Sequence, residues 1–477
     1  FVCPATVIRA DLWKLGQLKA GDSIRFVNVD QDTARQLDIA QQDSIDTLVH
    51  SHYSWQSSAI DSPIIKSLDA TELGDKIVYR AAGDQFLLVE YGELQLDLAL
   101  RFRANAMLNW LQENPLDGLQ ELTPGIRSLQ IHFDSRKLSH EAIIEHLIVG
   151  ETKLHNELTN LTVPSRIVHI PLSWDDEVCR QAIEKYTQSV RANAPWCPSN
   201  LEFIRRANGL KDIEAVKKIV FDASYLVMGL GDVYLGAPVA VPIDPRHRLV
   251  TTKYNPARTW TAENSVGIGG TYLCVYGMEG PGGYQFVGRT LQMWNRYHQT
   301  KEFSKPWLLR FFDQIRFYEV THDELEKIRK DFPKGKYPLK IEDTEFSLAD
   351  YQQFKQDNAD SIDAFIKKRD QEFANELAQW HANGQFHFEP VEEALVELEQ
   401  DWPEDSLVIE SPVAGSIWKT KVNPGQILEQ GQTLAILESM KMEIPLFASQ
   451  AGKVTHVLLK DGQRIQQGQA LFVMETE

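Results

Sequence analysis

The stretch Glu438-Ser-Met-Lys-Met-Glu-Ile444 places a lysine between two methionines, at the centre of an internal repeat. An offset of 37 residues superposes the two halves of the repeat, beginning with Ala414-Gly415 on Ala451-Gly452. Further pairs match at the same offset: Gly425-Gln426 with Gly462-Gln463, Gln430-Gly431-Gln432 with Gln467-Gly468-Gln469, Leu434 with Leu471, and Glu438 with Glu475. Both halves alternate apolar and polar residues between glycines, which is typical of short β-strands joined by tight turns. Two such copies predict a flattened β-barrel in which each half covers the apolar face of the other.

Lys441 lies in the joint between the two halves, where we expect an exposed turn. A surface lysine is ordinarily a solvated charge, but the repeat and the flanking Met440 and Met442 argue against that interpretation. Residues 406–477 resemble the biotinyl (biotin carboxyl carrier) domain, whose acceptor lysine lies in a Met-Lys-Met turn. The related lipoyl domains share the fold, but their lysine is usually flanked by Asp and a small residue. The resemblance implies that a biotin protein ligase attaches biotin to Lys441, in the turn formed with Met440 and Met442.

Length and composition limit the class of protein. A chain of 477 residues is too long for one core and predicts three or more domains. The net charge of −18 argues against nucleic-acid binding, and no apolar run approaches the length of a membrane span. The four cysteines form no C-x-x-C pair, so we predict no disulfide framework, no metal site and a reducing, cytoplasmic compartment. The start Phe1-Val-Cys-Pro resembles no signal peptide, and we interpret it as the cut edge of a longer chain.

The N-terminal third of the chain shows three different patterns. Residues 1–30 end in an Ala-Gly-Asp turn and an alternating strand over Ile24–Val27, as expected for the last part of a β-barrel domain that begins upstream. Residues 31–75 are polar and predict a linker with one helix around Thr33–Leu48. Residues 77–165 alternate strand and helix patterns, which predicts a small α/β domain with its helices on one face of a sheet.

Glycine punctuates the short apolar runs of residues 166–335, after two helices that we expect to begin at Ser173-x-x-Asp176 and Ser199-x-x-Glu202. The pattern predicts a closed β-barrel with tight corners, as at Gly267-Ile-Gly-Gly270, and these glycines are more readily explained by structure than by ligand contact. Residues 336–405 predict a long helix from Ser347 to about Gly384 and then an acidic linker. Such a one-signed linker suits a carrier arm, although a merely solvated linker would have the same composition.

Long blocks in the middle of the chain resemble the carboxyltransferase part of urea carboxylase. They belong to the half that is related to the kinase-inhibitor and allophanate-hydrolase-subunit proteins: Tyr79–Asp84, Asp222–Gly236, Asp244–Arg258 and Gly277–Arg289. The resemblance implies a multidomain α+β chain with a small α/β domain, a cyclophilin-like β-barrel, a linker helix and the flattened β-barrel biotinyl domain. It also implies that residues 1–30 end the companion half of the transferase. A biotin carboxylase component that uses ATP and Mg would lie upstream.

The activity implied by the resemblance is transfer of a carboxyl group from biotin on Lys441 to a urea nitrogen, which gives allophanate for an allophanate hydrolase. Urea is neutral and planar, so its N–H groups need acceptors and its oxygen needs a donor. Polar side chains on the glycine-cornered barrel supply both types. We therefore expect the catalytic pocket to contain Asp232, Tyr234, Arg246, His247, Arg258, Tyr284, Gln285 and Arg289.

Three alternatives to a urea-specific enzyme stay open at this point. Guanidine is chemically close to urea and could be the acceptor. The barrel could instead be a non-catalytic binding or inhibitory module carried with the biotin domain, which the attached carrier argues against. A transferase acting on an acyl-CoA or on pyruvate would need domains for which the sequence shows no pattern.

Overall fold

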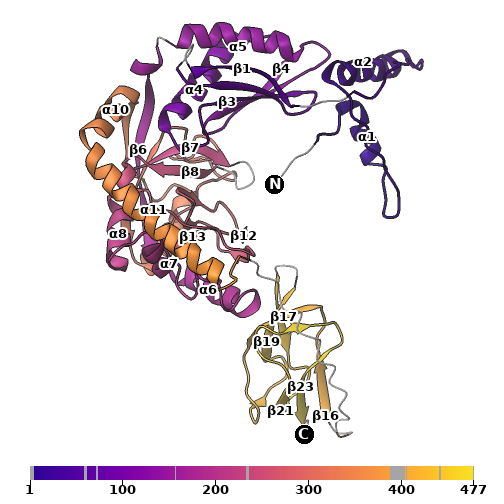
Figure 1. Ribbon diagram of the computed structural model, residues 1–477. Helices are drawn as coiled ribbons and strands as arrows, with labels where there is room; N and C mark the ends of the chain where they lie inside the picture. Colours follow the sequence, from indigo (N-terminus) through magenta and orange to yellow (C-terminus); the bar gives the residue numbers. More distant parts are fainter. Residues whose placement is uncertain are drawn as a thin grey trace. The chain divides into compact units, whose positions relative to one another are not determined.

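A computed structural model describes residues 5–58, 62–70, 74–155, 157–231, 236–386, 403, 406–439 and 442–475 (Figure 1). The chain divides into two compact units. The first comprises Phe1–Pro164 and Glu345–Asp357, and the second comprises Ser165–Thr344 and Asn358–Glu477. None of the helices in the described residues combines the length and the apolar character that a bilayer crossing requires.

The first unit begins with two short helical segments, η1 (Arg9–Asp11) and α1 (Leu12–Leu15), followed by the longer helix α2 (Gln31–Thr47). The helix α2 was expected from the sequence, and it begins where the Asp30 side chain accepts a hydrogen bond from the Thr33 amide. The strand expected over Ile24–Val27 is not formed in the described structure, where Phe26 is 73% exposed. A single β-strand is not stable without a partner to accept its hydrogen bonds, which explains the difference.

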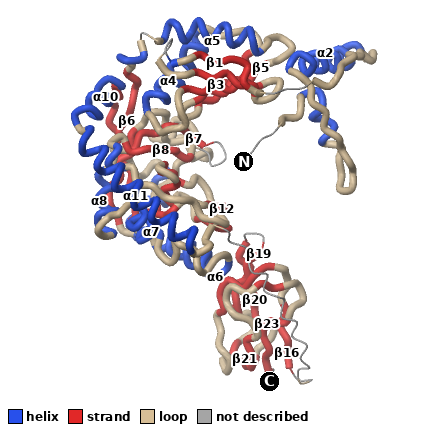
Figure 2. The backbone as a smooth tube through the Cα atoms, viewed as in Figure 1, coloured by secondary structure: helices blue, strands red, loops and turns tan. Residues whose placement is uncertain are grey.

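A five-stranded antiparallel sheet forms the core of the first unit, in the order β1-β2-β3-β5-β4. Its strands are β1 (Ile64–Leu68), β2 (Ile77–Ala81), β3 (Phe86–Tyr91), β4 (Leu119–Pro124) and β5 (Ser128–Phe133). Burial alternates along β5, so one face of the sheet is apolar. The helices α4 (Leu98–Glu113) and α5 (His140–Leu154) share a core with that face (Figure 2). The strand β1 extends the sheet into the segment expected to be a linker.

The second unit contains a closed β-barrel in the order β13-β10-β11-β8-β7-β14-β6, in which β13 pairs with β6. Its strands are β6 (Thr162–Trp174), β7 (Tyr225–Gly231), β8 (Ala237–Pro242), β10 (Ser265–Gly269), β11 (Tyr272–Val275), β13 (Gln285–Arg289) and β14 (Gln314–Val320). Closure requires a glycine, because a Cβ atom at Gly288 would lie 2.2 Å from the Ser173 carbonyl oxygen. Buried side chains such as Val168 and Val287 fill the interior.

Helices and a small ribbon surround this barrel. They are α6 (Glu177–Ser189), α7 (Asn200–Ala207), α8 (Ile213–Asp222), α9 (His322–Asp331), η3 (Pro245–His247), η4 (Phe332–Lys334) and the two-stranded sheet of β9 (Arg258–Thr261) and β12 (Gly280–Gly282). Ser199 caps α7 as predicted. The N-cap of α6 is Asp176, not Ser173, because Ser173 lies inside the long strand β6.

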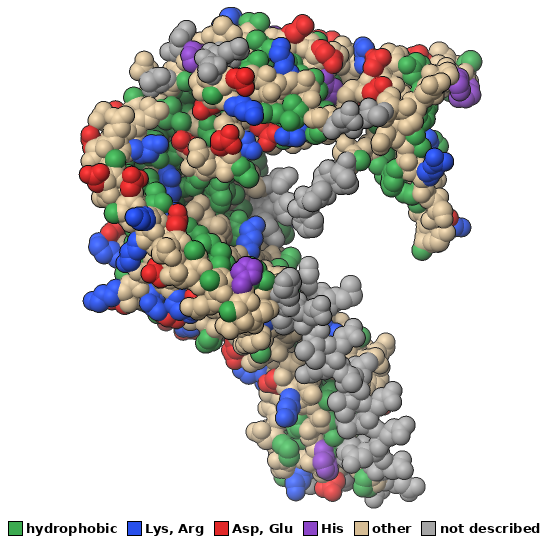
Figure 3. All heavy atoms as spheres, in the orientation of Figure 1, with side chains coloured by type: hydrophobic (Ala, Val, Ile, Leu, Met, Phe, Trp, Pro, Cys, Tyr) green, Lys and Arg blue, Asp and Glu red, His purple; other side chains and the backbone are tan. Residues whose placement is uncertain are grey.

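The predicted linker helix consists of two helices. The segment η2 (Leu158–Asn160) precedes β6, and β15 (Ile341–Ser347) extends the barrel sheet beyond β6. The Ser347 side chain accepts a hydrogen bond from the Asp350 amide at the start of α10 (Leu348–Asp357). A new helix, α11 (Ala359–Ala382), begins after Asn358. On the face of the molecule shown in Figure 3, acidic and basic side chains are interspersed.

The C-terminal domain consists of two four-stranded sheets, β16-β23-β21-β18 and β20-β19-β17-β22. Its strands are β16 (Ser406–Glu410), β17 (Gly415–Thr420), β18 (Ile427–Leu428), β19 (Thr433–Ser439), β20 (Met442–Phe447), β21 (Gly452–Val457), β22 (Arg464–Ile465) and β23 (Ala470–Glu475). The 37-residue offset maps β17 onto β21 and β18 onto β22. Each half places its short second strand in the sheet of the other half, and one core fills the space between the sheets.

Candidate functional site

The Met-Lys-Met stretch joins two paired strands of the C-terminal domain. The strands β19 and β20 are antiparallel, and their last pair is Ser439 with Met442. Met440 and Lys441, which connect the strands, lie outside the described residues, as does the side chain of Met442. The pairing of Ser439 with Met442 makes β19 and β20 the two strands of a hairpin, while the exposed turn and the biotin attachment expected at Lys441 stay predictions.

The base of this hairpin is fixed to the neighbouring strand β17. The Ser439 hydroxyl donates a hydrogen bond to the Ala414 carbonyl oxygen over 2.6 Å. A Cβ atom at Gly415 would lie 2.0 Å from the Glu438 carbonyl oxygen, so only glycine allows β17 and β19 to approach so closely. Gly415, from the first copy of the Ala-Gly motif, thus fixes the base of the hairpin by backbone contact.

The carrier domain contacts the barrel immediately before the hairpin tip. Glu438 accepts a hydrogen bond from the Thr259 hydroxyl over 3.3 Å, and its other carboxylate oxygen lies 3.4 Å from Lys185 Nζ. Lys185 belongs to α6 and Thr259 to β9. Glu438, which makes these contacts with the barrel, is followed by Ser439, the last described residue before the Met440-Lys441 connection.

Arg258, one of the predicted pocket residues, immediately precedes Thr259 in β9 and is 1% exposed. Its guanidinium carbon lies 4.2 Å from the Tyr254 ring centroid and 3.8 Å from that of Phe286, so two aromatic faces stabilise the cation. Nη1 donates to the Tyr284 carbonyl oxygen over 2.8 Å, and Nε lies 3.3 Å from Thr261 Oγ1. Nη2 is buried and has no hydrogen-bond partner among the described residues. Such a donor can bind an incoming anionic or carbonyl oxygen.

Tyr284 joins this arrangement through its backbone, and its side chain explains part of the glycine pattern. A Cβ atom at Gly269 would lie 2.5 Å from the Tyr284 ring, and one at Gly267 would lie 2.9 Å from the Tyr284 Cβ. Both glycines of β10 therefore leave space for this ring. Burial raises the pKa of the Tyr284 hydroxyl to about 12, so this group is neutral at physiological pH.

Gln285 lies on the other face of β13. Its neighbour Phe286 stacks on Arg258 and packs outside the barrel, whereas Gln285 is fully buried and donates from Nε2 to the Thr252 carbonyl oxygen over 3.0 Å. Because successive side chains of a strand alternate in direction, Gln285 and the Arg258–Phe286 stack lie on opposite sides of the strand. The buried Gln285 Oε1 has no hydrogen-bond partner among the described residues.

The other arginines of the predicted pocket are paired with carboxylates. Arg246 binds Asp244 over 2.7 Å and also contacts the start of α11 through Asn358 and Ser361. Arg289 binds Glu326 over 2.9 Å. It lies four residues beyond Gln285 in β13, which corresponds to about 13 Å along the strand.

Three predicted pocket residues remain, of which the structure describes one. His247 lies in η3, and burial lowers the pKa of its imidazole. Asp232 and Tyr234 lie outside the described residues. The structure therefore brings together Arg258 and the Tyr284 backbone next to the carrier contact, and gives the paired arginines structural partners of their own.

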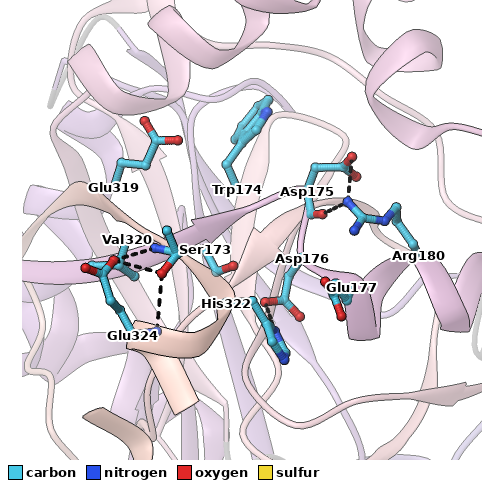
Figure 4. Close-up of a pocket in the computed structure, with 11 residues that line it drawn as sticks. Ser173, Trp174, Asp175, Asp176, Glu177, Arg180, Glu319, Val320, His322 and Glu324 are labelled. Carbon is cyan, nitrogen blue, oxygen red and sulfur yellow. Dashed lines mark hydrogen bonds and ion pairs between the residues drawn. The ribbon is translucent and has the colours of Figure 1, made fainter. Parts of the chain in front are cut away.

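A cavity of about 320 Å³ lies at another part of the barrel, between the ends of β6 and β14 and the starts of α6 and α9 (Figure 4). Its lining contains none of the predicted pocket residues. His322 Nδ1 lies 2.9 Å from Asp176 Oδ2, and this hydrogen bond raises the pKa of His322. The sequence indicated Asp176 only as part of a helix start, and His322 had no signal, because the two residues meet only in the folded barrel.

The described residues contain no cluster of His, Cys, Asp and Glu side chains arranged to hold a metal ion. The cysteines among them, Cys179, Cys197 and Cys274, are free thiols. Burial raises the pKa of the Cys179 thiol to about 12, as expected for a core residue that is not nucleophilic.

Three family models match the chain. Residues 77–304 match the carboxyltransferase domain, subdomain C and D. Residues 406–474 match the biotin-requiring enzyme domain, and residues 1–28 match the carboxyltransferase domain, subdomain A and B. The matches follow the order expected from the sequence motifs.

Known proteins resemble the chain over almost its whole length. The urea amidolyases of Lachancea kluyveri and Saccharomyces cerevisiae are 37% and 36% identical over 96% of this chain, and each match covers 25% of the relative. The crystal structure of Kluyveromyces lactis urea carboxylase is 37% identical, with a TM-score of 0.79. The match covers 99% of this chain and 42% of the chain in that crystal structure. The chain thus spans about a quarter of the length of these curated relatives.

Proposed function

Because the chain corresponds to the C-terminal part of urea carboxylases, with carboxyltransferase and biotin-attachment domains, we propose that it performs the carboxyl-transfer step from biotin on Lys441 to a urea nitrogen. The product would be allophanate. The observation that carries this proposal is the position of the carrier: the strand leading to Lys441 contacts β9, the strand that holds the buried guanidinium of Arg258.

The residues present fit a biotin group. The hairpin register leaves Lys441 in the connection between β19 and β20, and the Ser439 and Gly415 contacts fix the base of that hairpin. On the barrel, Arg258 supplies a buried N–H donor without a partner in the described structure. When attached to Lys441, biotin supplies a carboxyl group bound to nitrogen, which is the group to be transferred.

Arg258 is the residue that we propose to stabilise negative charge during the transfer. Its guanidinium is held between Tyr254 and Phe286 and is oriented by hydrogen bonds to Tyr284 and Thr261. A donor that is already oriented and largely removed from water needs no reorganisation when an oxygen becomes negative, which is the basis of oxyanion stabilisation. The neighbouring aromatic rings exclude water from the same place.

The wider reaction extends the proposal beyond this chain. Loading of biotin requires a biotin carboxylase component with ATP and Mg, and attachment of biotin requires a biotin protein ligase. An allophanate hydrolase would consume the product. We propose a cytoplasmic location, in keeping with the free thiols of the described residues.

A transfer assay tests the proposed acceptor. The biotinylated protein, with a biotin carboxylase component in the same polypeptide or added separately, is incubated with ATP, Mg and labelled bicarbonate. Urea, guanidine and acetyl-CoA are supplied in separate reactions. Label that enters an acid-labile product only with urea supports the proposal, and label that enters only with guanidine moves the assignment to a guanidine carboxylase. No transfer to any acceptor by fully biotinylated protein would refute the enzyme assignment.

A further inference from the structure

A lysine of the barrel is buried against the carrier domain. Lys185, on α6, is 4% exposed, and Glu438, on β19, is 9% exposed. Their charged atoms lie 3.4 Å apart. A lysine is almost never buried to this degree unless it is paired, so the barrel surface at α6 is adapted to a partner of opposite charge.

Two indole rings, one from each domain, flank the same ammonium group. Lys185 Nζ lies 4.8 Å from the Trp418 ring centroid in the carrier and 5.8 Å from the Trp260 ring centroid in β9 of the barrel. Tryptophan faces attract cations most strongly when water is excluded. The cation therefore interacts with both sides of the contact.

The last turn of α6 makes a second approach to the carrier. A Cβ atom at Gly462 would lie 2.5 Å from the Gln188 carbonyl oxygen, and Gly462 has a φ of +86°. Its repeat partner Gly425 has a φ of +92° but has nothing within 4 Å of its Cβ position. Each glycine is required by the positive φ of its own turn, but of these two turns only the one at Gly462 approaches the barrel.

We propose that Lys185 is a positioning residue that sets where the carrier docks on the transferase barrel, through its pair with Glu438. Glu438 precedes Lys441 by three residues in the sequence, and its contact with Thr259 holds the end of β19 beside β9, the strand that contains Arg258. This inference rests on the proposed transfer reaction, because only that reaction requires the hairpin tip to be placed accurately.

A buried ion pair suits a contact that must be specific and reversible. Desolvation of the two charges offsets much of their attraction, so the pair adds little net affinity. A carrier docked at a shifted position would bury Lys185 without the Glu438 carboxylate, which costs several kcal/mol. Other docking positions are therefore excluded, while the correct one stays weak enough for the carrier to leave.

Amine labelling of the full chain tests the docking itself, without any transfer reaction. Lys185 and the exposed Lys218 are compared in one protein by mass spectrometry after brief treatment with an amine-reactive reagent. The Lys218 side chain is 76% exposed, so it serves as an internal control. We expect Lys185 to react at least roughly tenfold more slowly than Lys218 in the wild-type chain, and Glu438→Gln to remove most of this difference. Equal labelling in the wild type, or no change in Glu438→Gln, would overturn the proposal.

Transfer kinetics give the second measurement, with Lys185→Met and the control Lys218→Met. Lys185→Met should lower kcat roughly tenfold or more and leave the KM for urea unchanged, because Lys185 has no role in binding the acceptor. Intact mass confirms equal biotinylation, and the exchanged pair Lys185→Glu with Glu438→Lys should recover part of the loss. A wild-type kcat in Lys185→Met would refute the positioning role. If the wild type transfers nothing to urea, the proposed function fails, but the labelling result still decides the docking contact.

Discussion

Replacing Arg258 by methionine removes the buried guanidinium and keeps an unbranched side chain between the same two rings. The substitution loses a charged hydrogen bond to Tyr284, worth about 1.5–3 kcal/mol, and two cation–π contacts of about 1–2 kcal/mol each. It also removes a buried charge whose desolvation costs several kcal/mol. These terms largely cancel, so we expect the free energy of unfolding to fall by only about 1–3 kcal/mol.

The effect on catalysis should be larger than the effect on stability. Loss of one oriented donor to a developing negative charge costs roughly 100- to 1000-fold in kcat. The assay is carboxyl transfer to urea, normalised to the biotinylated and folded fraction, with thermal unfolding measured in parallel. Arg316, an exposed arginine of β14, gives the control Arg316→Met, which should change neither quantity. A folded Arg258→Met variant with wild-type kcat would refute the assignment of Arg258 as the charge-stabilising donor.

Three further predictions follow from particular residues. After co-expression with a biotin protein ligase, the wild-type chain should carry a single biotin adduct in an intact-mass measurement, and Lys441→Arg should carry none. An adduct that persists in the variant would place the attachment at another residue. Gly288→Ala should destabilise the barrel by about 2 kcal/mol or more in denaturant unfolding, because its Cβ would lie 2.2 Å from a carbonyl oxygen that belongs to the backbone; an unchanged midpoint would contradict barrel closure at this position. The hydrogen bond to Asp176 raises the pKa of His322 in the folded protein. The stabilisation of the folded state by this pair is therefore complete below the pKa of histidine in the unfolded chain, about 6.5, and is lost as the pH rises through the pKa of His322 in the folded protein. The difference in Tm between wild type and His322→Gln should therefore be largest at pH 5–6 and shrink above pH 7. A difference independent of pH would show that the protonated His322–Asp176 pair does not stabilise the fold.

The local elements of the fold could be predicted because their signals are short-range. Ser199 caps α7 and Gly425 turns the chain of the carrier, and both act through backbone geometry within a few residues. The repeat also predicted the two-sheet carrier, since alternation and matched glycines specify both halves. The strand at Ile24–Val27 was not formed, because a strand depends on a partner that local pattern does not reveal.

The site was less predictable, because a side chain's role depends on contacts that are distant in sequence. The type and spacing of residues could not distinguish Arg258, whose Nη2 has no hydrogen-bond partner in the part of the chain that the structure describes, from Arg289, which binds Glu326. Arg246 could have been recognised as structural from Asp244, which lies two residues earlier and binds it. Lys185 gave no signal at all, since its partner Glu438 lies in another domain.

The exchange of short strands between the two halves of the carrier has a consequence for the order of events during synthesis. The strand β22 completes the sheet that bears the lysine hairpin, although it is made after that hairpin, and β23 completes the opposite sheet. A nascent chain that has exposed only the first half cannot bury its apolar face, so its lysine lies in an unfolded segment. We expect biotin ligase to modify the chain only after the second half has left the ribosome. A chain truncated before β22 should accordingly stay unmodified in cells, so incompletely synthesised chains would not carry biotin.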